Sequence, residues 1–306
     1  MKYILLYNPV SGKGKFRKKV PFIKKYFKDK NLKLDIYESM FQRDLETKAM
    51  ELAGQYDVLI ISGGDGTVNE VINGVMKSNS RPAIAILPSG TANDVASLLG
   101  FNKNIKRSLK IITESEPVKM DVNKINNHYF VYAIAAGLFT RVSYHVSRKR
   151  VKKYGYLAYL MDGARDIFNK YKMDMEIITN GKTYRGNYML ALGLSSRRVA
   201  GFFLFRFSKT KLDDGRVDLR LIKSADHFRL GRLILFFITG GKKRGKDVHL
   251  SSNEFIINTS DDIVWNTDGE KSAEGSIKIE VYNKALLVYA SKKSKKRFFN
   301  KTKTSN

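Results

Sequence analysis

A glycine-rich bend between a strand pattern and a helix pattern constrains the fold more than any other feature of this chain. The apolar run Val58–Ile61 leads into the bend, and apolar residues recur at helical spacing over Val68–Val75. Gly63, Gly64 and Gly66 permit positive φ and a close approach of the backbone to a ligand. A strand that turns this sharply into a helix presents unpaired N–H groups, which suit an anion.

One carboxylate, Asp65, stands inside this bend. Thr67 followed by Glu70 matches a capping box, which predicts that the helix starts at Thr67. The stretch is neither a Walker A loop nor a GxGxxG dinucleotide motif. On spacing alone, an ordinary strand–helix turn with a solvated Asp65 stays open.

Residues 1–122 alternate between strand and helix patterns, which predicts an α/β nucleotide-binding domain with a parallel sheet flanked by helices. Loops 8–15, 62–67 and 88–94 each follow a predicted strand, and ligands of such sheets bind beyond the carboxyl ends of the strands. We expect these loops to form one site. The expected strands are Tyr3–Tyr7, Lys33–Tyr37, Val58–Ile61 and Ala83–Leu87, and the expected helices are a basic helix ending near Lys28, Leu45–Leu52, Val68–Met76 and Asn93–Leu99.

Residues 123–284 change to short β-branched or aromatic runs separated by Gly, Asn and Asp, which predicts an all-β, sandwich-like domain or a flattened barrel. Residues 285–291 are expected to form a further strand, and whether it belongs to the first or the second domain stays open. Residues 292–306 are expected to be a basic, disordered tail. The expected strands are Tyr129–Ala136, Met175–Thr179, Thr183–Leu194, Gly201–Phe207, Val217–Ile222, Glu254–Asn258 and Ile277–Val281, with helices at Tyr154–Phe168 and His227–Thr239.

Composition narrows the function classes. The formal net charge of +27 favours anionic partners, namely nucleic acid, a phosphorylated cofactor or an acidic membrane surface. The absence of cysteine excludes disulfides, thiolate zinc sites and cysteine nucleophiles, and the scattered histidines disfavour a histidine metal site. No apolar run approaches the roughly 20 residues that span a bilayer. We therefore expect a cytoplasmic protein that is at most peripheral to a membrane.

Acidic residues recur in two motifs of the second half. Leu212–Gly215 joins two predicted strands and reads equally well as a tight turn. Asp268 and Glu270 stand two residues apart, so in an extended segment both side chains would point to one face. Such a pair can hold Mg²⁺ and supply a general base, whereas the alternative is a hairpin turn around Asp268 and Gly269.

Five motifs, taken in order along nearly the whole chain, resemble the soluble diacylglycerol kinase family and most closely its bacterial lipid kinases. The glycine-rich motif alone would also admit NAD kinases and phosphofructokinase relatives, but the C-terminal Asp-Gly-Glu favours the lipid kinases. The motifs are Asn8-Pro9 with Ser11-Gly12, Gly63-Gly64-Asp65-Gly66-Thr67 with Asn69-Glu70, Pro88–Asp94, Leu212–Gly215, and Asp268-Gly269-Glu270.

The resemblance implies that ATP binds the N-terminal domain and meets the lipid in a cleft between the two domains. The implied ATP-binding residues are Asn8, Pro9, Ser11, Gly12, Ser39, Gly63, Gly64, Asp65, Gly66, Thr67, Asn69, Glu70 and Thr91.

The resemblance also implies a catalytic Mg²⁺ network and a second, structural Mg²⁺ site. Glu270 matches the general base that takes the proton of the lipid hydroxyl, with Asp268 and Asp65 as its catalytic partners. The implied ligands of the catalytic Mg²⁺ network are Asp65, Asp94, Asp268 and, as a further candidate, Asp121, and those of the structural site are Asp214 with the backbone carbonyls of Lys211 and Arg216.

The implied function is an ATP- and Mg²⁺-dependent lipid kinase that phosphorylates diacylglycerol to phosphatidic acid at the cytoplasmic membrane surface. A polyprenol or sphingoid lipid, or a soluble substrate such as NAD, stays open. Two departures bear on the lipid: Ser195-Ser196 stands where relatives often carry Asn-Ser, and Thr140-Arg141 stands where many carry an acid.

Three basic runs, Arg148–Lys153, Lys242–Arg244 and Lys292–Arg297, suit an anionic membrane as partner. No specific nucleic-acid partner is expected, because no recognition module is visible. The sequence does not determine the oligomeric state, and a homodimer is one of the open alternatives.

Overall fold

The structure, a computed structural model, describes residues 1–137, 172–199, 202–207, 210–223, 229–245 and 247–300. Its chain forms two compact units, Met1–Val122 with Lys284–Asn306 and Asn123–Asn283. Strands β5 and β17 each continue from one unit into the other. The helix expected at Tyr154–Phe168 and the basic run Arg148–Lys153 lie outside the described residues.

The first unit is an α/β domain whose sheet has the strand order β2-β1-β3-β4-β17, with parallel pairing between neighbours. Every strand and helix expected before residue 100 is present. The elements are β1 (Lys2–Tyr7), α1 (Val20–Asp29), β2 (Lys33–Glu38), α2 (Asp44–Leu52), β3 (Val58–Gly63), α3 (Asp65–Lys77), β4 (Ala83–Pro88), α4 (Asp94–Leu99), α5 (Ile105–Glu114), β5 (Val118–Ile125), β17 (Ile277–Val288) and α10 (Lys292–Phe298).

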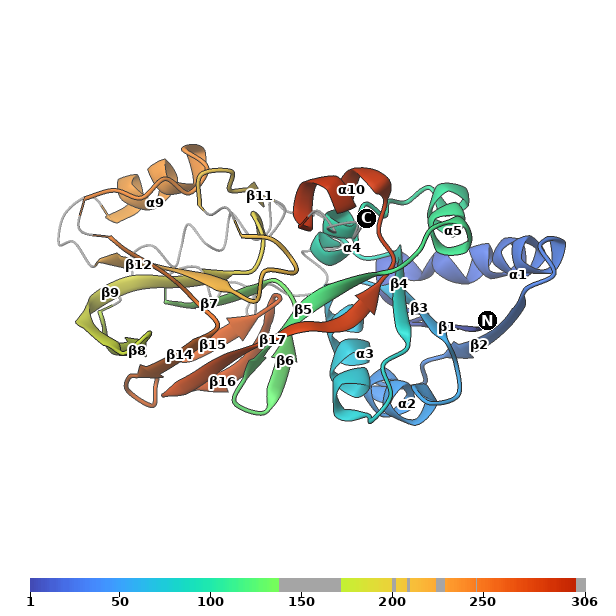
Figure 1. The fold of residues 1–306 in the computed structure, drawn as a ribbon, viewed down its shortest axis with the longest axis horizontal. Coiled ribbons are helices and arrows are strands. Elements are labelled where there is room, and N and C mark those ends of the chain that lie inside the picture. Colours follow the sequence, from blue (N-terminus) through green and yellow to red (C-terminus); the bar gives the residue numbers. More distant parts are fainter. Residues whose placement is uncertain (138–171, 200–201, 208–209, 224–228, 246, 301–306) are drawn as a thin grey trace, which may run out of the picture. The chain divides into compact units, whose positions relative to one another are not determined.

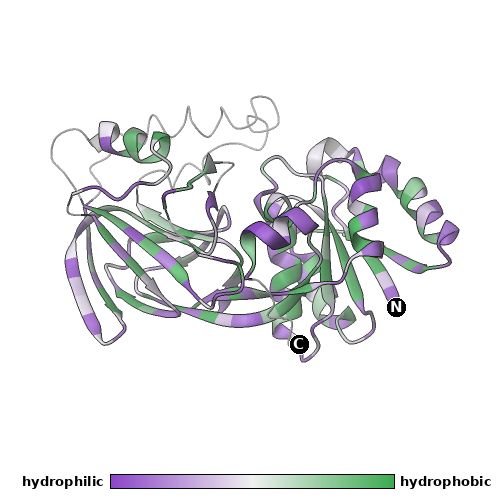
Figure 2. Ribbon diagram, turned by 45° about the horizontal axis from the view of Figure 1, so that its top comes forward, coloured by the Kyte–Doolittle hydropathy of each residue, from purple (hydrophilic) through white to green (hydrophobic). Residues whose placement is uncertain are grey.

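Burial on both faces explains why the central strands of this sheet carry almost only apolar residues. All residues of β3 and β4 are buried, and Figure 2 shows the central strands in the colour of hydrophobic residues. Helices α2 and α3 pack together on one face, with α1 and α5 on the other (Figure 1). Gly74 permits the close packing of α3 on α2, because a Cβ atom there would overlap the Glu46 carbonyl oxygen.

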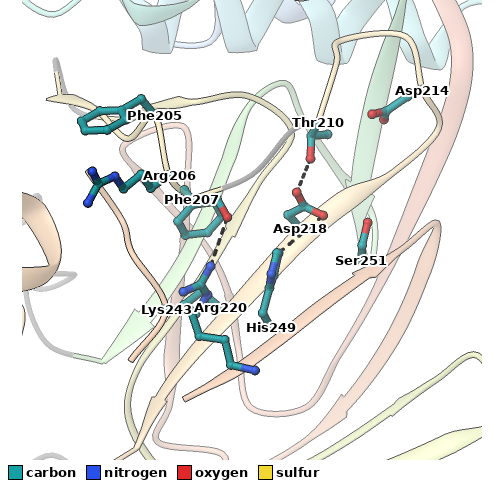
Figure 3. A pocket seen from close by; sticks show the side chains of 10 residues that line it. All are labelled: Phe205, Arg206, Phe207, Thr210, Asp214, Asp218, Arg220, Lys243, His249 and Ser251. Atoms are coloured by element: carbon teal, nitrogen blue, oxygen red, sulfur yellow. Dashed lines mark hydrogen bonds and ion pairs between the residues drawn. The ribbon is translucent and has the colours of Figure 1, made fainter. Parts of the chain in front are cut away.

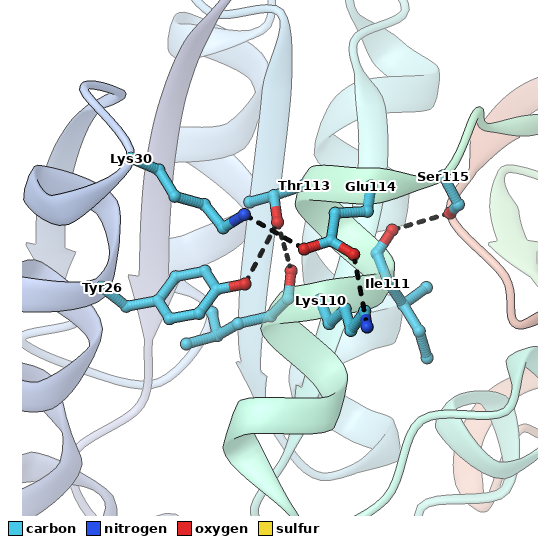
Figure 4. A network of polar contacts seen from close by, with 8 residues as sticks. Tyr26, Lys30, Lys110, Ile111, Thr113, Glu114 and Ser115 are labelled. Carbon is cyan, nitrogen blue, oxygen red and sulfur yellow. Dashed lines mark hydrogen bonds and ion pairs between the residues drawn. The ribbon is translucent and has the colours of Figure 1, made fainter.

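A small polar network ties α1 to α5 (Figure 4). Lys30 Nζ lies 3.0 Å from Glu114 Oε1, and the hydroxyls of Tyr26 and Thr113 are 3.3 Å apart. The hydrogen bond from Lys30 is the main cause that lowers the pKa of Glu114. These exposed contacts join two helices of the same face, and ion pairs this exposed add little to stability.

The end of the chain belongs to the first unit, and its expected disorder was wrong for Lys292–Phe298, which form helix α10. The Ser291 side chain caps this helix by accepting from the Ser294 N–H, and the Ser291 N–H donates to Leu99 O at 2.9 Å. Gly100, with φ +84°, lies against Ser291 and Ser294. The run is helical because it packs on α4, a tertiary contact that its lysine-rich composition does not reveal.

The second unit is built on an antiparallel sheet in which the long strand β9 pairs with β7, β8 and β12. Its elements are β6 (His128–Phe130), β7 (Ala133–Gly137), β8 (Met173–Thr179), β9 (Lys182–Leu194), β10 (Arg198–Val199), β11 (Phe202–Phe203), β12 (Val217–Lys223), α9 (Arg229–Ile238), β13 (Val248–Ser252), β14 (Glu254–Asn258), β15 (Val264–Thr267) and β16 (Glu270–Glu274).

A single apolar core, which includes Trp265, Phe130 and Phe255, lies beneath these strands. Three strand predictions were wrong in extent. The runs expected as separate strands at Ile277–Val281 and 285–291 form one continuous strand, β17. The run Tyr129–Ala136 forms two strands, β6 and β7, with a break at residues 131–132. In the run expected at Gly201–Phe207, of which residues 202–207 are described, Phe202–Phe203 is extended and residues 205–207 form a turn.

Within the part of the chain that the structure describes, no helix is long and apolar enough to cross a bilayer.

Candidate active site

The three loops that follow β1, β3 and β4 lie together in the first unit, as expected. The Asn8 N–H donates to Ser62 O at 3.1 Å, and the Ser89 and Gly90 N–H groups donate to Gly63 O at 3.0 and 3.2 Å. These bonds join the backbone of each outer loop to the end of the central strand β3. The carboxyl ends of three neighbouring parallel strands therefore form one rim.

Glycine is required where these loops touch. Gly12 has φ +58°, and a Cβ atom there would overlap the Ser89 carbonyl oxygen. A Cβ atom on Gly90 would overlap Gly64 Cα. The loops therefore meet backbone to backbone, with Gly12 and Gly90 in the contact, and this packing makes a preformed, glycine-lined surface.

Helix α3 begins at Asp65 with Gly64 as its N-cap, and no side chain caps it. The predicted capping box of Thr67 and Glu70 was therefore wrong, because both residues already lie inside the helix. Gly64 is extended, with φ −92° and ψ −172°, so the helix starts as soon as the chain leaves the bend. The first turn keeps backbone N–H groups without a side-chain cap, which is the arrangement that binds anions.

Asp65 connects the starts of two helices. Its Oδ1 accepts from the Val95 N–H at 3.2 Å in the first turn of α4. Asp94, the first residue of α4, is fully buried, with an exposed fraction of 0%. Two of the four carboxylates predicted for the catalytic metal network, Asp65 and Asp94, thus lie at the starts of α3 and α4.

The remaining predicted nucleotide residues of the first unit flank these loops. The Asn8 side chain accepts from the Val10 N–H, and the buried Ser39 donates its N–H to Tyr7 O at 2.9 Å, beside the end of β1. Asn69 is buried and its side-chain oxygen accepts from Asn73 at 3.0 Å. Pro9, Ser11 and Gly12 lie in the first loop, Gly63–Glu70 at the β3–α3 junction, and Thr91 in the β4–α4 loop.

Asp121 has a backbone partner in the structure. Its Oδ1 accepts from the Lys284 N–H at 2.6 Å, so the buried carboxylate holds β17 beside β5. This contact gives Asp121 a structural role in the first unit, and its place in a metal network stays a prediction.

Asp268 and Glu270 form a hairpin turn between β15 and β16 in the second unit. Asp268 and Gly269 have φ values of +51° and +97°, and Thr267 pairs with Glu270 across the turn. Of the two alternatives that the sequence left open, the hairpin turn around Asp268 and Gly269 is the one present, and the extended segment is not. Asp268 is buried, whereas the Glu270 side chain is exposed and makes no hydrogen bond or ion pair within the described residues.

Three backbone N–H groups hold the Asp268 carboxylate. Val131 donates to Oδ2 at 2.7 Å, and Tyr132 and Ala133 donate to Oδ1 at 3.0 and 3.1 Å. The Asp268 N–H donates in return to Ala133 O at 3.0 Å. Asp268 thereby anchors the turn that carries Glu270.

Asp214 lies in the loop before β12 and accepts from the backbone on both sides. The Lys211 N–H donates to Oδ2 at 2.8 Å and the Arg216 N–H to Oδ1 at 3.1 Å. Burial raises the pKa of Asp214, and these two hydrogen bonds act against that rise. The structural Mg²⁺ site at this loop stays a prediction.

Within the described residues, no group of three or more acidic, histidine or cysteine side chains is positioned to hold a metal ion. Mg²⁺ does not require such a cage, because it usually keeps several waters and binds through one or two carboxylates together with phosphate oxygens. Carboxylate oxygens of Asp65 and Asp94, beside a helix start that no side chain caps, fit that chemistry.

Sequence reasoning missed several residues that shape the site. Ser62 and Ser89 hold the loops together. Ser62 directly precedes the glycine-rich motif and Ser89 lies inside the Pro88–Asp94 motif, so their positions next to these motifs could have identified them. The backbone of Val131–Ala133, which holds Asp268, could not be predicted from the sequence. Nearly every residue supplies a backbone N–H group, and the contact joins residues 135–137 positions apart.

Comparison with known proteins adds a separate line of evidence. Residues 2–125 match the family model of the diacylglycerol kinase catalytic domain. The chain is 31% identical over 268 residues to the diacylglycerol kinase of Staphylococcus saprophyticus, covering 87% of this chain and 88% of that protein. It is 31% identical over 269 residues to that of Staphylococcus aureus strain RF122, covering 87% and 85%.

Solved structures agree with these relatives. A crystal structure of a diacylglycerol kinase from Bacillus anthracis superimposes with a TM-score of 0.77 at 26% identity, covering 95% of this chain and 98% of that one. A second structure from the same organism gives a TM-score of 0.81 at 26% identity, covering 96% of both chains.

Proposed function

This chain belongs to the family of diacylglycerol kinase catalytic domains and is a kinase, and from that premise we propose an ATP- and Mg²⁺-dependent lipid kinase. Its reaction transfers the γ-phosphate of ATP to the hydroxyl of a lipid alcohol. Diacylglycerol is the first candidate substrate, because the relatives at 31% identity are named diacylglycerol kinase. The product would then be phosphatidic acid. A polyprenol or sphingoid alcohol is the alternative lipid.

The proposed ATP site rests on one observation. Three glycine-bearing loops converge on the start of α3, which no side chain caps. The close backbone contacts at Gly12 and Gly90 leave no side chain at the point where the loops touch. The helix start supplies N–H donors and positive potential for phosphate oxygens. ATP therefore binds with its phosphates against the β3–α3 bend.

The proposed Mg²⁺ site rests on Asp65 and Asp94. When bound, Mg²⁺ neutralises charge that develops on the phosphate oxygens during transfer. Asp65 would hold the ion directly or through water, and its bond to the Val95 N–H fixes the carboxylate between α3 and α4. An acid inside an anion site would then contribute to phosphate binding, because a bound cation would offset the repulsion between the carboxylate and the phosphate.

The proposal assigns the proton transfer to Glu270 in the second unit. The lipid hydroxyl oxygen forms a bond to the γ-phosphorus, the bond from that phosphorus to the bridging β-phosphate oxygen breaks, and ADP leaves. Glu270 accepts the hydroxyl proton. Its exposure lets it meet a substrate, and the three N–H bonds to Asp268 hold the turn that carries it.

We assign the reaction to the cytoplasmic surface of a membrane, where the lipid resides. Two basic runs support this assignment: Lys242–Arg244 is exposed, and Lys292–Arg297 lies in α10. Each basic residue near an anionic bilayer contributes about 1 kcal/mol to association.

The decisive experiment incubates the full chain with labelled ATP, Mg²⁺ and a panel of lipid alcohols in mixed micelles. Labelled phosphatidic acid from diacylglycerol is the expected product, and it should not form when Mg²⁺ is chelated. Label on NAD with none on any lipid would replace the lipid kinase with a kinase of a soluble substrate.

A further inference from the structure

The second unit contains a cavity of about 660 Å³ to which the proposed reaction gives no role. It lies among the β11–β12 segment, the turn after α9 and strand β13 (Figure 3). Arg206, Arg220 and Lys243 are cations among its lining residues, and Asp214 and Asp218 are its carboxylates.

Arg220 is a buried cation whose donors are largely unused. It lies on β12 with an exposed fraction of 1%, and its Nη2 donates to Phe207 O at 3.1 Å. Within the described residues, its Nε and Nη1 atoms, which together carry three N–H donors, have no hydrogen-bond partner. Burial lowers the pKa of Arg220, and the charges of Asp247 and Asp218 act against that fall. Neither carboxylate takes up the Nε and Nη1 donors, and buried donors without an acceptor are costly. The free donors of Arg220 therefore point to an anionic ligand.

The carboxylates of the cavity are already engaged elsewhere. The hydroxyl of Thr210 donates to Asp218, which also lies 3.8 Å from His249 Nε2 (Figure 3). Asp214 accepts from two backbone N–H groups, as described above. The cationic side chains Arg206 and Lys243 are exposed, so they extend the positive side of the cavity to the surface.

Apolar side chains are exposed beside the same residues. Phe205, which lines the cavity, is 51% exposed, and Ile238 at the end of α9 is 75% exposed. Gly240 lies against the Phe205 ring, and the Arg206 N–H donates to Gly240 O at 2.7 Å, so both segments share one surface. Figure 2 shows α9 as largely hydrophobic. An exposed apolar patch bordered by cations matches the interface of an anionic bilayer.

We propose that this cavity binds the phosphate group of an anionic phospholipid, with Arg220 as the inner cation and Arg206 and Lys243 at the mouth. Phe205 and Ile238 then enter the interface beside the bound lipid. The site deepens the membrane part of the proposed function, because it names the lipid chemistry and the surface that receive the protein. It is separate from the residues assigned to phosphoryl transfer.

Vesicle binding without ATP tests the site independently of the kinase assay. The probes are phosphatidylcholine vesicles with and without phosphatidylglycerol, and co-sedimentation measures the partition of the full chain. Replacing both Arg206→Gln and Lys243→Gln should weaken binding to the mixed vesicles roughly 30-fold, about fivefold per charge. The matched control, Lys182→Gln with Arg185→Gln, removes two exposed charges on β9 and should change binding less than about twofold.

Arg220→Met distinguishes the cavity from a merely basic surface. This variant should keep a cooperative melt and lose binding to phosphatidylglycerol vesicles about tenfold, on the scale of one charge-assisted contact. Arg220→Lys, which retains the charge, serves if the methionine variant does not fold, and it should bind less tightly than the wild type. Wild-type binding by either folded variant would overturn the assignment.

The same variants identify the source of the phosphate. If inorganic phosphate or glycerol 3-phosphate raises the wild-type melting temperature but not that of the Arg220 variant, and vesicles do not bind, then the site takes a soluble phosphate and the lipid proposal is wrong. Competition between soluble glycerol 3-phosphate and the vesicles for the same site would support it.

Discussion

The Asp65 carboxylate accepts a hydrogen bond from the backbone N–H of Val95 at 3.2 Å, so one acid joins the start of α3 to the start of α4. The contact places a negative charge in the glycine-rich bend, where the proposed function puts the phosphates, while it organises the neighbouring helix. Structure and proposed chemistry thus depend on the same side chain, and substitutions at Asp65 can separate them.

Asp65→Asn retains a side-chain oxygen that can accept from Val95 but removes the charge. We expect its stability to stay near that of the wild type, whereas Asp65→Ala loses about 1 kcal/mol through the missing hydrogen bond. Both variants should lose lipid phosphorylation by roughly 100-fold or more, the scale of one electrostatic group in a transition state. Denaturant unfolding and initial rates give the two readouts. An active Asp65→Asn enzyme would reduce Asp65 to a structural contact.

Gly90→Ala tests the contact between loops. The new Cβ atom would overlap Gly64 Cα, so the loops must separate. We expect a loss of stability of about 1–3 kcal/mol from overpacking, together with weaker ATP binding by calorimetry. Gly231→Ala in α9 is the control, because nothing lies within 4 Å of its Cβ position. Unchanged ATP affinity in Gly90→Ala would remove the loop contact from the nucleotide site.

Glu270→Gln addresses the general base. The side chain is exposed and unpaired within the described residues, so the free energy of unfolding should change by less than about 0.5 kcal/mol. Turnover should fall on the order of 10²- to 10⁴-fold with ATP binding retained. Glu274→Gln, an exposed acid of the same strand, should keep full activity. Near-normal turnover in Glu270→Gln would exclude this residue as the base.

Asp268→Ala should destabilise the second unit. It leaves the N–H groups of Val131, Tyr132 and Ala133 without their acceptor, and buried unsatisfied donors together should cost about 3 kcal/mol or more. Asp268→Asn tolerates the positive φ and keeps one acceptor oxygen, so its loss should be smaller. Urea unfolding ranks the variants. Equal stability of the alanine variant and the wild type would contradict the anchoring role.

Alkaline pH should weaken the first unit through Tyr289. Burial raises its pKa from 10.0 to about 12. The stabilisation from the neutral phenol is fully present below pH 10 and is lost as the pH rises through about 12, because the unfolded chain ionises first. Tyr289→Phe should therefore lose less of its melting temperature over this range than the wild type. Tyr282→Phe, at an exposed tyrosine, should behave as the wild type.

Local patterns were sufficient for the strands and helices before residue 100, because those elements obey short-range rules, whereas α5 and β5 were not predicted. The buried strands β3 and β4 are continuous apolar runs, and glycine-rich loops follow them, so the order of strands, helices and candidate loops could be predicted. The start of α3 was placed two residues late, because the capping-box pattern suggested Thr67 where the extended Gly64 already ends the bend. The helix α10 was missed because its contact with α4 lies far away in the sequence.

By itself, the sequence determined the α/β character of residues 1–122, the three loops of one rim and the positions of the acids that carry the proposed chemistry, since these depend on residue type and spacing. Only the tertiary structure decided what each acid touches. Asp65 bonds to α4, Asp121 holds β17, and Asp268 is buried under three N–H groups while Glu270 stays exposed. Those partners are backbone atoms brought close by folding, and backbone atoms are the same in every sequence.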